Sequence, residues 1–237
     1  MDEFVAWLLA GDAAVAYQTH RDLLGEQRPD LAAAIAGDGD AAVLLAARTP
    51  TGHWGRGFYQ PKWTSSHYTL LELRNLGLPG THPPARETVQ LILQEKGPDG
   101  GVNPSGRVHA SDICINGMFL DFGCWFGATA AEVSGVVDFL LAQAMPDGGY
   151  NCHSNRSGAR IASVHTTVSV IEGYTTYLAS GATRRATEVR AARDAAVECL
   201  LDRELFRRRG TTEPISAEFT RLHHPARWHF DVLRGLD

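Results

Sequence analysis

The stretch Pro98-Asp99-Gly100-Gly101-Val102 decides the fold, because it recurs as Pro146-Asp147-Gly148-Gly149-Tyr150 and, in a weaker form, as Thr51-Gly52-His53-Trp54. The last residues of the three copies are separated by 48 residues each time, and equal spacing is the signature of a structural repeat. Asp and Gly accept the positive φ values that sharp turns require. Each copy is therefore predicted to end one helix and to reverse the chain.

Between these turns, the apolar residues follow the 3.6-residue period of α-helices. We expect long helices over 62–78, 83–96, 109–125, 129–144, 162–180 and 184–206, shorter ones over 2–10, 12–25, 28–36 and 39–49, and a last helical stretch over 215–236. Alternation typical of strands is nearly absent. The sequence therefore predicts an all-α protein.

Two helices and a glycine turn cannot bury their apolar faces alone, so neighbouring repeats must stack as an open solenoid or a closed ring. The segment 109–125 is apolar nearly all round, whereas 129–144 has a polar side. Alternation of buried inner helices with half-exposed outer ones favours a closed ring, an α-α toroid of roughly five to six helix pairs. We expect a single domain that comprises N-terminal helices (1–50), the best-matching repeats (51–182) and C-terminal helices (183–237).

Composition and charge argue against several classes of function. Hydrophobic residues make up 44% and charged residues 21% of the 237-residue chain, which is ordinary for a globular protein. The net charge of -5 offers no broad basic surface for nucleic acid or anionic membrane. The N-terminus is acidic where a signal peptide is basic, and no apolar run is long enough to form a transmembrane segment. We therefore expect a cytoplasmic protein without a nucleic-acid partner.

Asp112-Ile113-Cys114 and, on the next repeat, His165 supply three residue types that together can bind zinc. Asp112 and Cys114 stand where the chain is expected to begin a helix, a place where residues two apart can converge. His165 stands at the start of the inner helix of the following repeat. The four cysteines of the chain are widely spaced and form no CxxC pair, so we expect reduced thiols. Three such ligands would leave the fourth position of a zinc ion open for chemistry.

Each of these residues also has a structural alternative. Asp112 could be a helix N-cap, because Asp is favoured at that position. Cys114 could be a small buried apolar residue, and His165 a histidine of the core. Cys152 and His153, directly after the third turn, are alternative metal ligands, although two adjacent residues seldom chelate one ion.

Three segments together resemble the metal-binding half of protein prenyltransferase β subunits: PDGGVNPSGRVHASDIC (98–114), PDGGYN (146–151) and ASVHTTVSVIEGYTTYLASG (162–181). In that family, Gly-Gly turns precede an Asp-x-Cys and then a His on the following repeat. The family fold is an α-α toroid shared with squalene and other terpene cyclases. The resemblance implies that Asp112, Cys114 and His165 bind zinc, that the ion activates an acceptor thiol, and that a separate helical subunit is a partner.

The resemblance also implies a site for a prenyl diphosphate. The family has basic residues just ahead of the Asp, and Arg107 and His109 lie there in this chain, Arg107 displaced by one position. A guanidinium suits a diphosphate because it can donate two charge-assisted hydrogen bonds at once. Two positions where the family has aromatic residues are occupied by Met118 and Val164. The Asp-x-Asp-Asp acid of protonation-type cyclases is missing from the repeats.

Further aromatic and basic residues precede or begin the first and last predicted inner helices. They either pack in the core or line a cavity and contact phosphate, and the candidates for substrate binding are Lys62, Trp63, His67, Trp228 and His229. We therefore predict a zinc-dependent transferase of the prenyltransferase or terpene cyclase-like type, acting on an isoprenoid diphosphate or a similar apolar substrate. The alternative is a non-catalytic toroid or helical-repeat protein that binds an apolar ligand or a protein partner.

Overall fold

The computed structural model describes residues 2–105 and 108–237. Within these residues the chain forms twelve α-helices and no β-strand, which confirms the predicted all-α class. The chain separates into two compact units, residues 1–89 and 90–237. The single domain and the closed ring stay predictions.

The first unit is built from short helices. These are α1 (Glu3–Leu9), α2 (Ala13–Gln18), α3 (Pro29–Ala34), α4 (Gly39–Ala46), α5 (Ser66–Asn75) and most of α6 (Pro83–Ile92), with a π-helical turn at Thr19–Leu24 and 3-10 turns at Ile35–Gly37 and Lys62–Thr64. The N-cap of α2 is Asp12, whose carboxylate accepts the backbone N–H of Val15. It packs against α3 and α4. The helix α5 is buried along most of its length, with Leu70 and Leu73 fully enclosed.

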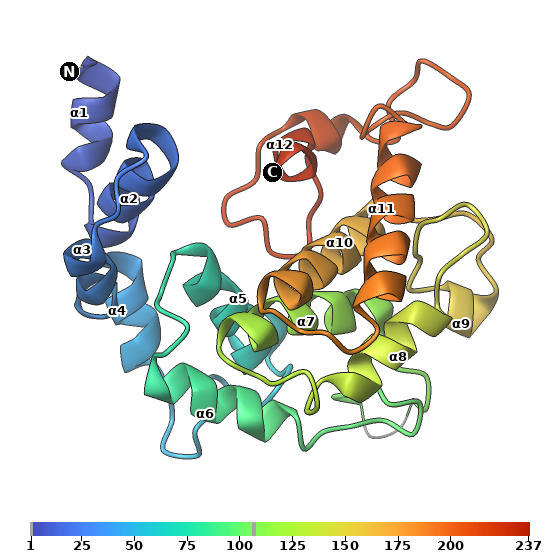
Figure 1. Ribbon diagram of the computed structural model, residues 1–237, viewed down its shortest axis with the longest axis horizontal. Coiled ribbons are helices and arrows are strands. Elements are labelled where there is room, and N and C mark those ends of the chain that lie inside the picture. The colour runs from blue at the N-terminus through green and yellow to red at the C-terminus, as the bar shows by residue number, and fades with distance from the viewer. Residues whose placement is uncertain (1, 106–107) are drawn as a thin grey trace. The chain divides into compact units, whose positions relative to one another are not determined.

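The second unit is organised around two adjacent helices. Its elements are α7 (Ile113–Trp125), α8 (Ser134–Ala142), α9 (Ser154–Ser157), α10 (Val164–Ala179), α11 (Ala186–Leu201), a 3-10 turn at Ala217–Thr220 and α12 (Val232–Leu236). Helices α7 and α10 pack side by side, and α8 and α11 pack against them and against each other (Figure 1). The two central helices contribute fully buried side chains, among them Phe119, Phe122 and Tyr174. Their N-terminal ends carry the candidate site.

The three repeated turns are built alike. The residue that closes each turn is buried and donates its backbone N–H to a polar side chain of α5, α7 or α10. The three bonds run from Trp54 to Ser66 Oγ (3.0 Å), from Val102 to Asn116 Oδ1 (2.7 Å) and from Tyr150 to Thr167 Oγ1 (3.0 Å). A buried N–H needs such a partner because leaving it unsatisfied is costly. The same bond therefore fixes the three turns against the first turns of α5, α7 and α10, respectively.

Several helix boundaries differ from the predicted ones. The helix α7 begins at Ile113 rather than at 109, because the Asp99 carboxylate accepts both the backbone N–H (2.7 Å) and the hydroxyl (2.6 Å) of Ser111 and holds the preceding chain outside the helix. The expectation of one helical stretch over 215–236 is corrected: only 217–220 and 232–236 are helical. Pro225 lies between them, and the residue before a proline is disfavoured in the α conformation.

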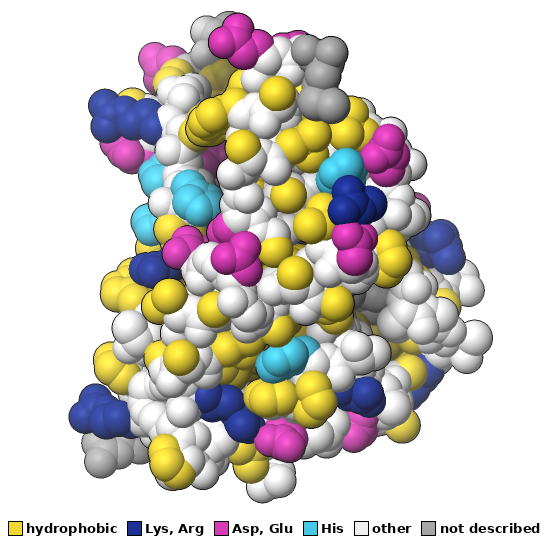
Figure 2. Space-filling model, turned by 90° about the vertical axis from the view of Figure 1, so that its left-hand side faces the viewer, with side chains coloured by type: hydrophobic (Ala, Val, Ile, Leu, Met, Phe, Trp, Pro, Cys, Tyr) yellow, Lys and Arg dark blue, Asp and Glu magenta, His cyan; other side chains and the backbone are white. Residues whose placement is uncertain are grey.

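The described surface carries charges of both signs. On the face drawn in Figure 2, Lys and Arg side chains are interspersed with Asp and Glu, without a large area of one sign. Among the helices of the described residues, none is both long enough and apolar enough to cross a membrane.

Gly117 allows close packing of α7 against α10, and its replacement gives a first prediction. A Cβ at this position would lie 2.7 Å from the carbonyl oxygen of Ser169, whereas a Cβ at Gly123 of the same helix would meet only ring carbons of Phe119, at 3.4 Å or more. We expect Gly117→Ala to lower the free energy of unfolding by about 1–3 kcal/mol through overpacking. Gly123→Ala should be neutral or stabilising by up to about 1 kcal/mol, because Ala favours helix. Urea unfolding measures both, and equal effects would contradict the close approach.

Candidate metal centre

Asp112 occupies the N-cap position of α7, but its carboxylate makes no capping hydrogen bond to the helix. Its Oδ1 instead accepts a hydrogen bond from the Cys114 thiol at 3.4 Å, and its Oδ2 pairs with the Arg156 guanidinium at 3.2 Å. Asp112 therefore has the backbone position of an N-cap, but its side chain does not act as one. The side chain faces a neighbouring thiol and a cation.

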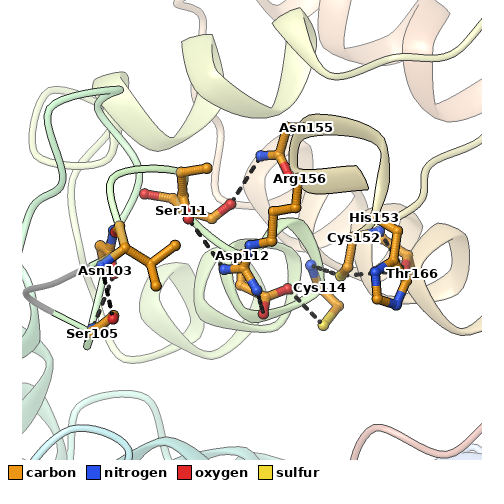
Figure 3. Close-up of polar contacts among 12 residues, drawn as sticks. Asn103, Ser105, Ser111, Asp112, Cys114, Cys152, His153, Asn155, Arg156 and Thr166 are labelled. Atoms are coloured by element: carbon orange, nitrogen blue, oxygen red, sulfur yellow. Dashed lines mark hydrogen bonds and ion pairs between the residues drawn. The ribbon is translucent and has the colours of Figure 1, made fainter. Parts of the chain in front are cut away.

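Cys152 completes the group from the next repeat. The backbone N–H of Cys114 donates to Cys152 Sγ at 3.1 Å, and the hydroxyl of Thr166 donates to the same sulfur at 3.4 Å. The candidate ligand atoms of Asp112, Cys114 and Cys152 all lie within 4.8 Å of one another, and all three residues are partly exposed. Figure 3 shows the three side chains converging beside the start of α7. This group could hold a metal ion.

The loop that carries Cys152 is tied to the chain ahead of α7. Asn155 Nδ2 donates to the carbonyl of Ser111 at 3.1 Å (Figure 3). The Arg156 guanidinium donates to the carbonyl of Ala110, also at 3.1 Å. Both residues belong to the short helix α9, which the sequence analysis did not predict. The only signal for them in the sequence is their position three and four residues after Cys152.

The surroundings of Cys114 disfavour the ionisation of its thiol. The pKa of the Cys114 thiol is raised well above its ordinary value by its hydrogen bond with Cys152, by burial, and by the charges of Cys152 and Asp112. A nearby negative charge disfavours a second one at short range. A divalent ion would reverse the effect, because a coordinated thiol loses its proton. The donor set therefore fits a metal cation chemically.

His165 lies outside this group. It is on the first turn of α10, where its Nδ1 accepts the backbone N–H of Phe230 at 2.9 Å. Its ring packs against Phe219 and Trp228, with ring centroids 5.1 Å away in each case. The next residue, Thr166, is the one that contacts the Cys152 sulfur. Of the three predicted ligands, Asp112 and Cys114 lie together in the structure. His165 instead contacts residues of the C-terminal segment.

The second unit also holds residues that were predicted for substrate binding. His109 is exposed, as is His153, which was named with Cys152 as an alternative metal ligand. Trp228 stacks on His229 with ring centroids 4.2 Å apart, and both rings are half-buried. Arg107 lies outside the described residues.

In the first unit, the predicted residues form one aromatic cluster. The Lys62 ammonium lies 4.6 Å from the centre of the Trp63 ring, and that ring is 5.1 Å from Tyr68. His67 is fully buried, with its ring 5.6 Å from Phe58 and 4.9 Å from Tyr68. Burial lowers the pKa of His67 to about 3. His67 therefore belongs to the core of this unit and is neutral at physiological pH.

The environment of His165 gives a prediction of pH dependence. Burial, with a smaller contribution from the Arg234 charge, lowers its pKa to about 4 from an ordinary value of 6.5. The unfolded chain therefore binds the proton more tightly, so stability is present above pH 6.5 and is lost as the pH falls from 6.5 towards 4. We expect the melting temperature of His165→Asn to fall less steeply over this range than that of the unsubstituted protein. Parallel slopes for His165→Asn and the unsubstituted protein would refute the assignment.

A comparison of the chain with protein-family models found no match. A search of curated proteins also found no match.

Proposed function

We propose that this protein is a zinc-dependent transferase whose ion is held by Asp112, Cys114 and Cys152. The observation that carries the proposal is the convergence of one carboxylate and two thiols within 4.8 Å. Zinc accepts all three ligand types, and catalytic zinc sites use three protein ligands and keep a fourth position open. The resemblance to prenyltransferases implies His165 as the third ligand, and we propose Cys152 in its place.

The surrounding residues have distinct parts in such a site. A zinc ion held there would act as a Lewis acid and would lower the pKa of a thiol or water in the open position. Thr166 and the backbone of Cys114 orient the Cys152 sulfur through the two hydrogen bonds that it accepts. Arg156 holds the Asp112 carboxylate and places a guanidinium beside the site, where it can also bind the oxygen of an anionic substrate.

The resemblance to prenyltransferases supplies the substrate class, an isoprenoid diphosphate or a similar apolar molecule, and a thiol as its acceptor. Arg156 supports the anionic part of such a substrate, because its charge lies at the metal group. We therefore propose Arg156 as a diphosphate-binding residue, the role that the resemblance implies for Arg107 and His109. A separate helical subunit remains a proposed partner on the resemblance alone.

Two binding measurements test the proposal. Titration of reduced, metal-free protein with zinc should give one tight site, which Cys114→Ala abolishes and Cys199→Ala retains, since Cys199 lies in the core outside the group. A prenyl diphosphate should then raise the melting temperature of the zinc-loaded protein, because a ligand of the native state must stabilise it. Absence of zinc binding would reject the metal centre. Zinc binding without a shift by the diphosphate would reject the substrate class.

A further inference from the structure

Two of the four cysteines are paired and accessible. Cys124 and Cys199 are buried in the core, whereas Cys114 and Cys152 are partly exposed. The sulfur atoms of this second pair lie within 4.8 Å of each other. They come from positions 38 residues apart, on two consecutive repeats. The fold itself therefore brings two thiols together at the surface.

The contacts around Cys152 hold its sulfur beside Cys114. One donor is the backbone N–H of Cys114 itself, at 3.1 Å, and the other is the Thr166 hydroxyl, at 3.4 Å. Cys152 lies outside the regular helices, between the third turn and α9. A loop position can adjust its backbone to the narrow geometry of a disulfide more easily than a residue inside a helix.

We propose that Cys114 and Cys152 are a site of reversible oxidation, which forms a disulfide with glutathione disulfide or a similar small disulfide as oxidant. The Cys152 sulfur attacks one sulfur of the oxidant and forms a mixed disulfide, and one glutathione leaves with a proton. The Cys114 sulfur then attacks the Cys152 sulfur, and the second glutathione leaves with the second proton. The two protein thiols lose two electrons, and the oxidant is reduced to two glutathione molecules.

The disulfide and a metal ion exclude each other. A metal is bound by thiolates, and both sulfur atoms of the proposed centre are consumed by the bond, which leaves Asp112 as the remaining ligand of the group. This second part of the inference rests on the proposed zinc site, whereas disulfide formation itself does not. Oxidation would therefore release the ion, and a bound ion would protect the thiols.

The experiment treats the native, full-length protein with glutathione disulfide, with and without prior loading with zinc. In the metal-free protein, mass spectrometry of the digested chain should find a link between Cys114 and Cys152, reversed by dithiothreitol. Cys152→Ser should yield no internal link, and Cys199→Ala should form it as the unsubstituted protein does. Zinc should slow the oxidation at least about tenfold, as expected when the reacting thiolates are coordinated.

The possible failures are distinct. Free thiols, or glutathione attached to single cysteines without an internal link, would overturn the proposed disulfide even if zinc binds. A disulfide in the metal-free protein, combined with an absence of zinc binding, would reject the metal centre and the mutual exclusion while leaving the oxidation site. Zinc that binds tightly but leaves the oxidation rate unchanged would reject the mutual exclusion alone.

Discussion

Replacing Cys152 with alanine is expected to lower the affinity for zinc by about 100-fold or more, because it removes one of only three protein ligands. Structural zinc sites with four protein ligands bind with about 10–16 kcal/mol, which is about 3 kcal/mol or more for each ligand. His165→Ala is expected to leave the affinity within about threefold. The reason is geometric: Cys152 Sγ lies within 4.8 Å of the Asp112 and Cys114 ligand atoms, whereas His165 Nδ1 accepts a hydrogen bond from Phe230. Competition with a chromophoric chelator measures both affinities.

The comparison separates the structure-based ligand set from the one implied by the family resemblance. Cys199→Ala serves as the control for the loss of a thiol outside the group, and circular dichroism reports whether each variant keeps its helices. If His165→Ala loses zinc and Cys152→Ala keeps it, the ligand set is Asp112, Cys114 and His165. The site would then require a rearrangement of the C-terminal segment around Phe230.

Removing the carboxylate of Asp147 is expected to lower the free energy of unfolding by about 3–5 kcal/mol. Asp147 Oδ2 accepts the backbone N–H of Ala162 at 2.9 Å and pairs with the Arg203 guanidinium at 3.2 Å. The two side chains are only 11% and 7% exposed. Asp147→Ala therefore leaves a buried cation without its counter-ion, which is the costly way to break such a pair.

Asp99 provides the matched control from the preceding repeat. Its carboxylate accepts hydrogen bonds from Ser111 as Asp147 accepts one from Ala162, but no ion pair of Asp99 is found among the described residues. Asp99→Ala should therefore cost less, about 1–3 kcal/mol, the usual penalty for unsatisfied buried donors. The double variant Asp147→Ala with Arg203→Met should recover part of the loss, because it removes the unpaired charge. Equal costs for the two aspartates in denaturant unfolding would show that the ion pair contributes little.

Much of the fold could be predicted from the sequence because its signals are local. The Gly-Gly turns and the 3.6-residue period locate α5, α7, α8, α10 and α11. The hydrogen bond that the three turns share is seen only in the structure. The convergence of Asp112 and Cys114 also follows from local structure, since both lie where α7 begins. The C-terminal stretch was misjudged because Pro225 interrupts it, and its apolar residues Phe219 and Phe230 pack in one core cluster without lying on one helix.

The third member of the metal group could not be settled from sequence. Which side chain of the next repeat faces Asp112 depends on how far α10 is rotated about its axis, and this rotation directs Thr166 rather than His165 towards the Cys152 sulfur. The position of His165 is further fixed by Phe230, 65 residues away in the chain. Cys152 could only be named as an alternative, because its approach depends on the docking of the third turn through Tyr150 and Thr167.

X-ray absorption spectroscopy of the zinc-loaded protein tests the central claim most directly, because it counts the sulfur atoms bound to the ion. The proposed centre of Asp112, Cys114 and Cys152 predicts two zinc–sulfur distances of about 2.3 Å, with the remaining ligands being oxygen. One sulfur accompanied by the scattering pattern of an imidazole, or no sulfur at all, would contradict it.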